Sequence, residues 1–192
     1  MQHLVYVHGF LSAPGSHKAQ LTQQWLARYH PQIQYHCPHL SPYPQQAQQQ
    51  LKDLMADLEG QQVGLVGSSL GGFWSTWLIE HYSGMNAVLI NPSVRPFEFV
   101  SELVGETLNN YYTDDTYQMQ PEHAGQLREA YPSELVDKSR YWVLVQTGDE
   151  TLDYRQAVER YDGCHVTIEQ GGDHGFQDYD RHLPDIIDFL FR

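Results

Sequence analysis

The stretch Val63-Gly64-Leu65-Val66-Gly67-Ser68-Ser69-Leu70-Gly71-Gly72 decides how this chain is interpreted. A short apolar run leads into Gly67–Gly71, which fits the pattern G-x-S-x-G with Ser69 at its centre. The apolar residues 73–79 that follow predict a buried helix. A strand, such a turn and a helix in this order hold the central serine in a strained backbone conformation. The alternative interpretation is an ordinary glycine-rich turn.

The glycines of this motif have a steric role. Cβ atoms at Gly67 and Gly71 would clash across a turn this tight. Ser68 is a poorer candidate for the centre, because position 66 is Val66 rather than glycine. We therefore expect the Ser69 hydroxyl at the top of a sheet. It would lie above the first N–H groups of the next helix, which can stabilise a developing oxyanion.

The chain length favours a single α/β domain, residues 1–192, with a sizeable core. A formal net charge of −13 argues against nucleic-acid and anionic-membrane partners. No apolar run approaches the ~20 residues of a membrane span, and Met1–His8 lacks the basic start of a secretory signal. Cys37 and Cys164 lack C-x-x-C spacing, so we expect buried reduced thiols in a cytoplasmic protein, with no metal and no cofactor.

Short apolar runs alternate with amphipathic ones along the chain. The amphipathic runs predict helices between the strands. Alternating β and α elements predict a mostly parallel sheet of about six strands with helices on both faces. Ligands of such sheets bind at the carboxyl ends of the strands. The predicted strands are His3–Val7, Gln32–Cys37, Gln62–Val66, Asn86–Ile90, Tyr141–Gln146 and His165–Glu169.

Residues 97–140 interrupt the alternation, because they are far longer than a typical connection. An apolar stretch from Phe99 to Leu108 comes first, a polar tyrosine-rich loop over 111–117 follows, and a second helical stretch starts near Pro121. We expect a small helical cap over the active edge of the sheet. A side decoration packed against the domain is the alternative.

The loops after the first and fourth predicted strands contain candidate binding groups. His8-Gly9-Phe10 follows the first strand, and the N–H of Phe10 is expected to pair with that of Leu70 as an oxyanion hole. His8 is expected to orient this loop rather than to act in catalysis. Arg95, after the fourth strand, is a candidate for holding an anionic part of a substrate. A structural or solvated arginine is the alternative.

Asp149 and His174 follow the last two predicted strands. With Ser69 they give the order Ser, Asp, His, which is the expected chain order when the serine lies on a strand-to-helix turn. In this interpretation His174 takes the proton of Ser69 and returns it to the leaving group, while Asp149 orients the imidazole ring. Asp153 is expected to cap the next helix and Asp173 to stabilise the histidine loop.

Five segments together resemble the bacterial YqiA-type esterases, which are small members of the α/β-hydrolase superfamily. The resemblance spans nearly the whole chain. It implies an α/β-hydrolase fold with a trimmed sheet, a Ser69–Asp149–His174 triad and activity on acyl esters or acyl-CoA thioesters. The segments are His8-Gly9-Phe10, Gly67 to Gly72, Asn91-Pro92 with Val94-Arg95-Pro96, Gln146 to Glu150, and Gly172-Asp173-His174.

The leading hypothesis is a cytoplasmic serine esterase acting on a small acyl ester through an acyl-enzyme. An acyl-CoA thioesterase is the alternative within the same chemistry, and acyl transfer to another acceptor also fits the residues. A catalytically silent hydrolase fold used for binding is the alternative from a different class. The sequence leaves the acyl chain length, the physiological substrate and the oligomeric state open.

Overall fold

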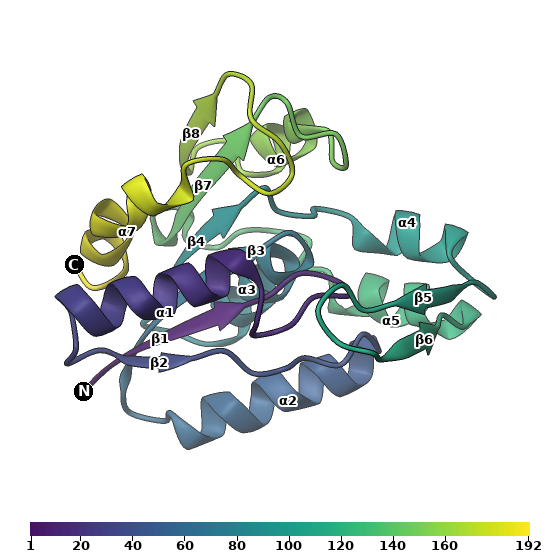
Figure 1. The fold of residues 1–192 in the computed structure, drawn as a ribbon, viewed down its shortest axis with the longest axis horizontal. Helices are drawn as coiled ribbons and strands as arrows, with labels where there is room; N and C mark the ends of the chain where they lie inside the picture. Colours follow the sequence, from purple (N-terminus) through teal and green to yellow (C-terminus); the bar gives the residue numbers. More distant parts are fainter.

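The computed structural model describes all of residues 1–192, and its central feature is one six-stranded sheet (Figure 1). The strand order is β2-β1-β3-β4-β7-β8, and every neighbouring pair is parallel. The predicted fold class and all six predicted strands are confirmed. The strands are β1 (Gln2–Val7), β2 (Gln34–His36), β3 (Gln62–Ser68), β4 (Asn86–Ile90), β7 (Tyr141–Gln146) and β8 (His165–Glu169).

Helices cover both faces of this sheet and bury two separate apolar cores (Figure 1). Side chains of a strand alternate between the faces, so Leu4 joins the smaller core and Val5 the larger one. The smaller core lies under α1 (His17–Tyr29) and α7 (Leu183–Leu190). The larger core lies under α2 (Pro44–Asp57), α3 (Leu70–His81) and α6 (Tyr154–Arg160).

Helix α3 is the most deeply buried helix, since residues 70–79 are all buried. Its sequence is apolar all round, which is typical of a helix enclosed by protein. This burial fixes the start of α3, and with it the turn that joins α3 to β3. None of the helices combines the length and apolar character that crossing a membrane requires. Cys37 and Cys164 are free and only half-buried, where burial was expected.

The segment between β4 and β7 contains a hairpin that the sequence analysis did not predict. Helix α4 (Pro96–Glu102) comes first, then the antiparallel strands β5 (Thr107–Asn109) and β6 (Thr116–Gln118). The expected polar loop 111–117 is therefore partly strand. The expected helical stretch near Pro121 is confirmed as α5 (Pro121–Ala130), and the short helix η1 (Lys138–Arg140) leads into β7.

Two hydrogen bonds tie this hairpin to the loop that follows β1. The N–H of Tyr111 donates to the carbonyl of Leu11 at 2.9 Å, and the amide of Asn110 donates to the carbonyl of Ser12 at 3.0 Å. Figure 1 shows α4, α5 and the hairpin gathered at one end of the molecule. The hairpin therefore lies beside the carboxyl end of β1, where the sequence analysis expects the site.

Candidate active site

Ser69 lies between the end of β3 and the start of α3, on the strained turn that the motif predicts. Its backbone has φ 55° and ψ −121°, a conformation that side-chain-bearing residues rarely adopt. A Cβ at Gly67 would lie 2.4 Å from the carbonyl oxygen of Gly71, and one at Gly71 would lie 1.8 Å from that of Val7. Only glycines therefore allow the turn to close and present the serine.

His174 and Asp149 meet Ser69 from the loops after β8 and β7. His174 Nε2 lies 3.1 Å from Ser69 Oγ, and His174 Nδ1 lies 2.8 Å from Asp149 Oδ2 and 3.0 Å from Oδ1. An ionised carboxylate only accepts hydrogen bonds, so Nδ1 carries the proton and Nε2 is free to accept from the serine hydroxyl. The structure thus brings all three predicted residues into one hydrogen-bonded chain.

The Asp149 side chain is 2% exposed and keeps its charge through hydrogen bonds. Burial on its own raises the pKa of this carboxyl. The hydrogen bonds from His174 and from the N–H groups of Leu152 and Thr151 outweigh burial, and the pKa falls below its usual value. Asp149 Oδ1 accepts from these two N–H groups at 2.8 and 2.9 Å. A carboxylate in this state can stabilise a protonated imidazole.

The loop after β1 passes directly against Ser69. A Cβ at Gly9 would lie 3.2 Å from the Ser69 Cβ. The N–H of Phe10, the next residue, donates to no acceptor in the protein, and Leu70 is the first residue of α3, where N–H groups lack helical partners. These two groups are chemically suited to bind an anionic oxygen at Ser69.

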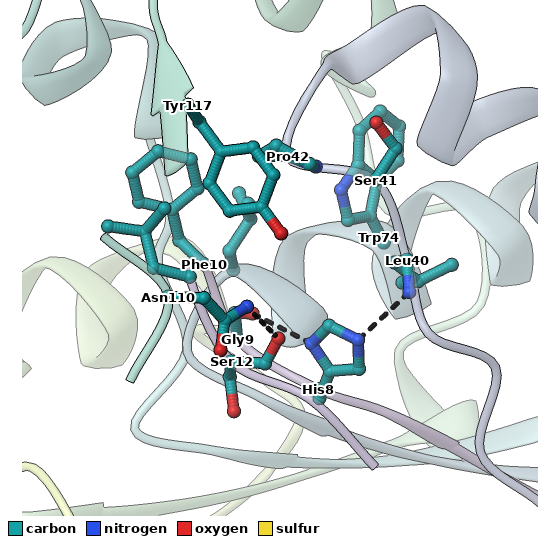
Figure 2. A pocket seen from close by; sticks show the side chains of 12 residues that line it. His8, Gly9, Phe10, Ser12, Leu40, Ser41, Pro42, Trp74, Asn110 and Tyr117 are labelled. Atoms are coloured by element: carbon teal, nitrogen blue, oxygen red, sulfur yellow. Dashed lines mark hydrogen bonds between the residues drawn. The ribbon is translucent and has the colours of Figure 1, made fainter. Parts of the chain in front are cut away.

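His8 hydrogen-bonds both this loop and Leu40, as Figure 2 shows. Its Nε2 accepts from the N–H of Leu40 at 2.9 Å, so its Nδ1 carries the proton and donates to the carbonyl of Gly9, also at 2.9 Å. Burial lowers the pKa of His8 to about 4, so the ring is neutral near pH 7. The loop-orienting arrangement expected of His8 is present.

A cavity of about 560 Å³ opens over Ser69. Ser69, His174 and Phe10 are among the residues that line it. One wall is apolar and comes largely from the segment between β4 and β7, and the Phe99 ring packs edge-on against Phe10 at 5.9 Å between centroids. The apolar wall residues are Leu11, Phe99, Leu103, Leu108, Tyr111, Tyr112 and Leu152. The segment that the sequence analysis singled out thus provides much of the binding surface.

Arg95 does not reach this cavity. Its guanidinium pairs with Glu98 at 3.1 Å and lines a separate shallow pocket beside Pro92 and Asp153. The structure therefore does not bring Arg95 to Ser69, because the turn into α4 directs it towards Glu98 one helical turn on. No group of His, Cys, Asp and Glu side chains is arranged to hold a metal ion.

A sequence model of the uncharacterised protein family UPF0227 matches residues 3–191 of the chain. The chain belongs to UPF0227. The resemblance to the YqiA-type family is thereby confirmed over nearly the whole length.

Solved structures share the fold of this UPF0227 chain at low sequence identity. A candidate hydrolase from Agrobacterium vitis superimposes with a TM-score of 0.76 at 16% identity, covering 98% of this chain and 88% of that one. Mouse alpha/beta hydrolase domain-containing protein 10 gives 0.72 at 16% identity, with 97% and 89% covered. Est1E from Butyrivibrio proteoclasticus gives 0.71 at 12% identity, with 98% and 86% covered. The UPF0227 chain therefore has an α/β-hydrolase fold.

Two buried amides of the UPF0227 chain, which sequence reasoning missed, hold the histidine loop. Asn91 donates to the carbonyls of Asp173 and His174 at 3.0 and 3.2 Å and accepts from the N–H of Gln146 at 3.0 Å. The Gln146 side chain accepts from the N–H groups of Asp173 and Gln177. The available signal was a polar residue at the end of each of two apolar strands.

Acidic residues beside His174 also stabilise the loop that carries it. Glu150 Oε2 accepts from the N–H of His174 at 3.0 Å, so Glu150 faces the loop backbone rather than the imidazole. Asp173 accepts from the side chain of Gln177 at 2.9 Å and thereby stabilises the loop, as expected. Asp153 caps α6 through the N–H of Arg155, as expected. His174 is thus held by its backbone on two sides as well as by Asp149.

Proposed function

We propose that this UPF0227 protein is a serine hydrolase that cleaves acyl esters through a covalent acyl-enzyme. The observation that carries the proposal is the hydrogen-bonded chain from Asp149 through His174 to Ser69, which lines a cavity of about 560 Å³. Three properties support it together: a strained serine, a histidine with a free Nε2 and a carboxylate that stays charged.

The reaction has two balanced halves. Ser69 Oγ bonds to the carbonyl carbon of the ester as its proton passes to His174 Nε2, and the N–H groups of Phe10 and Leu70 bind the oxyanion. The carbon–oxygen bond to the leaving group then breaks, and His174 Nε2 gives its proton to the departing oxygen. In the second half a water molecule gives its proton to His174 and bonds to the acyl carbon. Ser69 leaves, regains the proton, and the carboxylic acid is released.

A serine-directed fluorophosphonate tests the proposal directly. Intact mass should show a single adduct on the native protein, none on Ser69→Ala, and an unchanged adduct on the matched variant Ser68→Ala. A well-folded native protein that forms no adduct would contradict the proposal and favour the silent binding fold. An adduct that survives in Ser69→Ala would contradict the choice of nucleophile.

The same groups can act on thioesters, since the acyl-enzyme is identical. Comparing kcat/KM for a butanoyl ester with that for butanoyl-CoA separates the two activities. Esterase activity with a negligible thioester rate would remove the thioesterase alternative.

A further inference from the structure

The cavity above Ser69 contains no carboxylate, although the chain is strongly acidic. Asp and Glu make up 24 of the 192 residues, one residue in eight, yet none of the 21 residues lining the cavity is acidic. Its titratable lining consists of one lysine, Lys18, three histidines and three tyrosines. The binding surface is therefore electropositive relative to the rest of the molecule.

Lys18 supplies the formal positive charge of this surface. It lies in the first turn of α1 and is partly buried, and its Nζ donates to the carbonyl of Gly175 at 2.7 Å. It forms no ion pair with a carboxylate. Burial lowers the pKa of Lys18 to about 8, against the attraction of Asp173 and Asp149, so the group is mostly protonated at pH 7. An ammonium has three donors, so two remain for a ligand.

The position of Lys18 indicates which part of a substrate it faces. His174 gives its proton to the leaving-group oxygen, so the leaving group lies on the histidine side of Ser69. Gly175, to which Lys18 is bonded, is the next residue after His174. The apolar wall from Phe99 to Tyr112 suits an apolar acyl chain instead.

We propose that the substrate of this site is an ester with an apolar acyl group and an anionic leaving group, whose carboxylate or phosphate binds Lys18. This inference rests on the proposed hydrolase function and makes Lys18 a specificity-determining residue. The leaving group would be a small hydroxy acid or a phosphorylated alcohol, according to which anion Lys18 receives.

Matched esters test the inference. The probes are the butanoyl esters of para-hydroxybenzoate, of para-hydroxyphenyl phosphate and of neutral para-hydroxybenzamide, assayed on the native protein, Lys18→Met and Lys18→Arg. We expect Lys18→Met to lower kcat/KM for the better anionic ester about ten- to hundredfold relative to the neutral one, the range for a hydrogen bond to a charged group. Lys18→Arg should keep most of the preference, and the exposed Lys52→Met should change neither ester. The better of the two anionic esters identifies the anion.

Three outcomes would overturn the inference. An equal loss for all three esters in Lys18→Met would mean that Lys18 only tethers the loop at Gly175. Unchanged kcat/KM values for all three esters would mean that no anion binds at Lys18. In a second pair, phenyl esters of succinic acid and of its monoamide, a Lys18-dependent preference for the charged acyl group would reverse the assignment of sides.

Fluorophosphonate labelling of the same preparations distinguishes failure of the substrate inference from failure of the hydrolase proposal. If Ser69 is labelled in the native protein and in Lys18→Met but the ester ratio does not change, the substrate inference fails while the hydrolase proposal stands. If the native protein is not labelled, both fail.

Discussion

The side-chain amide of Asn91 lies 3.2 Å from the carbonyl oxygen of His174, so the residue directly after β4 holds the backbone of the residue that hydrogen-bonds Ser69. The same side chain also donates to the carbonyl of Asp173 and accepts from the N–H of Gln146. One buried side chain thus joins the ends of β4 and β7 to the histidine loop.

Asn91→Asp tests this junction, because it keeps the shape and the acceptor but loses the donor. Two carbonyl oxygens would then face a carboxyl group. We expect stability to fall by about 1–3 kcal/mol. We also expect kcat to fall at least about tenfold, because the geometry of His174 relaxes. Urea unfolding and ester turnover measure the two effects, with the exposed Asn109→Asp as control. A variant as active and stable as the native protein would show that the histidine loop keeps its position without the hydrogen bonds that Asn91 donates.

Asp149→Asn should remove activity without unfolding the protein. The amide oxygen can still accept from Thr151 and Leu152, but the amide NH₂ can donate to His174 Nδ1 and move the ring proton to Nε2. That tautomer cannot accept from Ser69, and we expect kcat to fall about 10⁴-fold. Asp153→Asn, which keeps an N-cap, is the matched control for turnover and thermal unfolding. Activity within tenfold of native would argue that Asp149 does not set the tautomer.

His8 makes stability depend on pH. Burial lowers its pKa in the folded protein to about 4, from the usual 6.5 of an exposed histidine, so the folded state prefers the neutral ring. This stabilisation is fully present above pH 6.5 and is lost as pH falls towards 4, by which point the loss reaches about 3 kcal/mol. His8→Gln keeps an acceptor for Leu40 but does not titrate. Urea unfolding at pH 7 and near pH 4.5 should show that the native protein loses more stability on acidification than the variant. Parallel losses would contradict the role of His8.

Gly9→Ala should weaken catalysis through the oxyanion loop. The added methyl would lie 3.2 Å from the Ser69 Cβ and 3.4 Å from the carbonyl oxygen of Ser68, so the loop must move by a few tenths of an ångström. Loss of a whole oxyanion donor costs about 10²–10³ in kcat, so we expect about a tenfold loss for displacing the N–H of Phe10. Gly15→Ala is the control, since nothing lies within 4 Å of its added methyl. Equal kcat values for the two variants would contradict this role of the loop after β1.

The sequence predicts the parts of this protein that follow local rules. The positions of the strands along the chain follow from the alternation of apolar runs. Ser69 follows from the G-x-S-x-G motif, and Asp149 and His174 follow from the rule that ligands bind at strand ends. The supporting contacts are long-range: Asn91 lies 82 residues from Asp173, its hydrogen-bond partner. No local pattern indicates such a pair. The hairpin β5–β6 was missed because strands of three residues carry too little alternation. Arg95 was expected to hold an anionic part of a substrate, but it pairs with Glu98 and does not line the cavity.

The two hydrogen bonds between the hairpin and the loop after β1 connect two parts of the cavity that come from different stretches of the chain. The groups proposed to react come from loops after β1, β3, β7 and β8, whereas the apolar wall comes mainly from residues 99–112. Exchanging this one contiguous piece of chain would therefore change the apolar wall of the cavity and leave the Ser69, Asp149 and His174 loops in place. The exchange works only if the new piece keeps the bonds made by Asn110 and Tyr111, since these anchor the wall to the loop that carries Phe10. With those two hydrogen bonds kept, residues 99–112 can change in evolution without moving Ser69, Asp149 and His174.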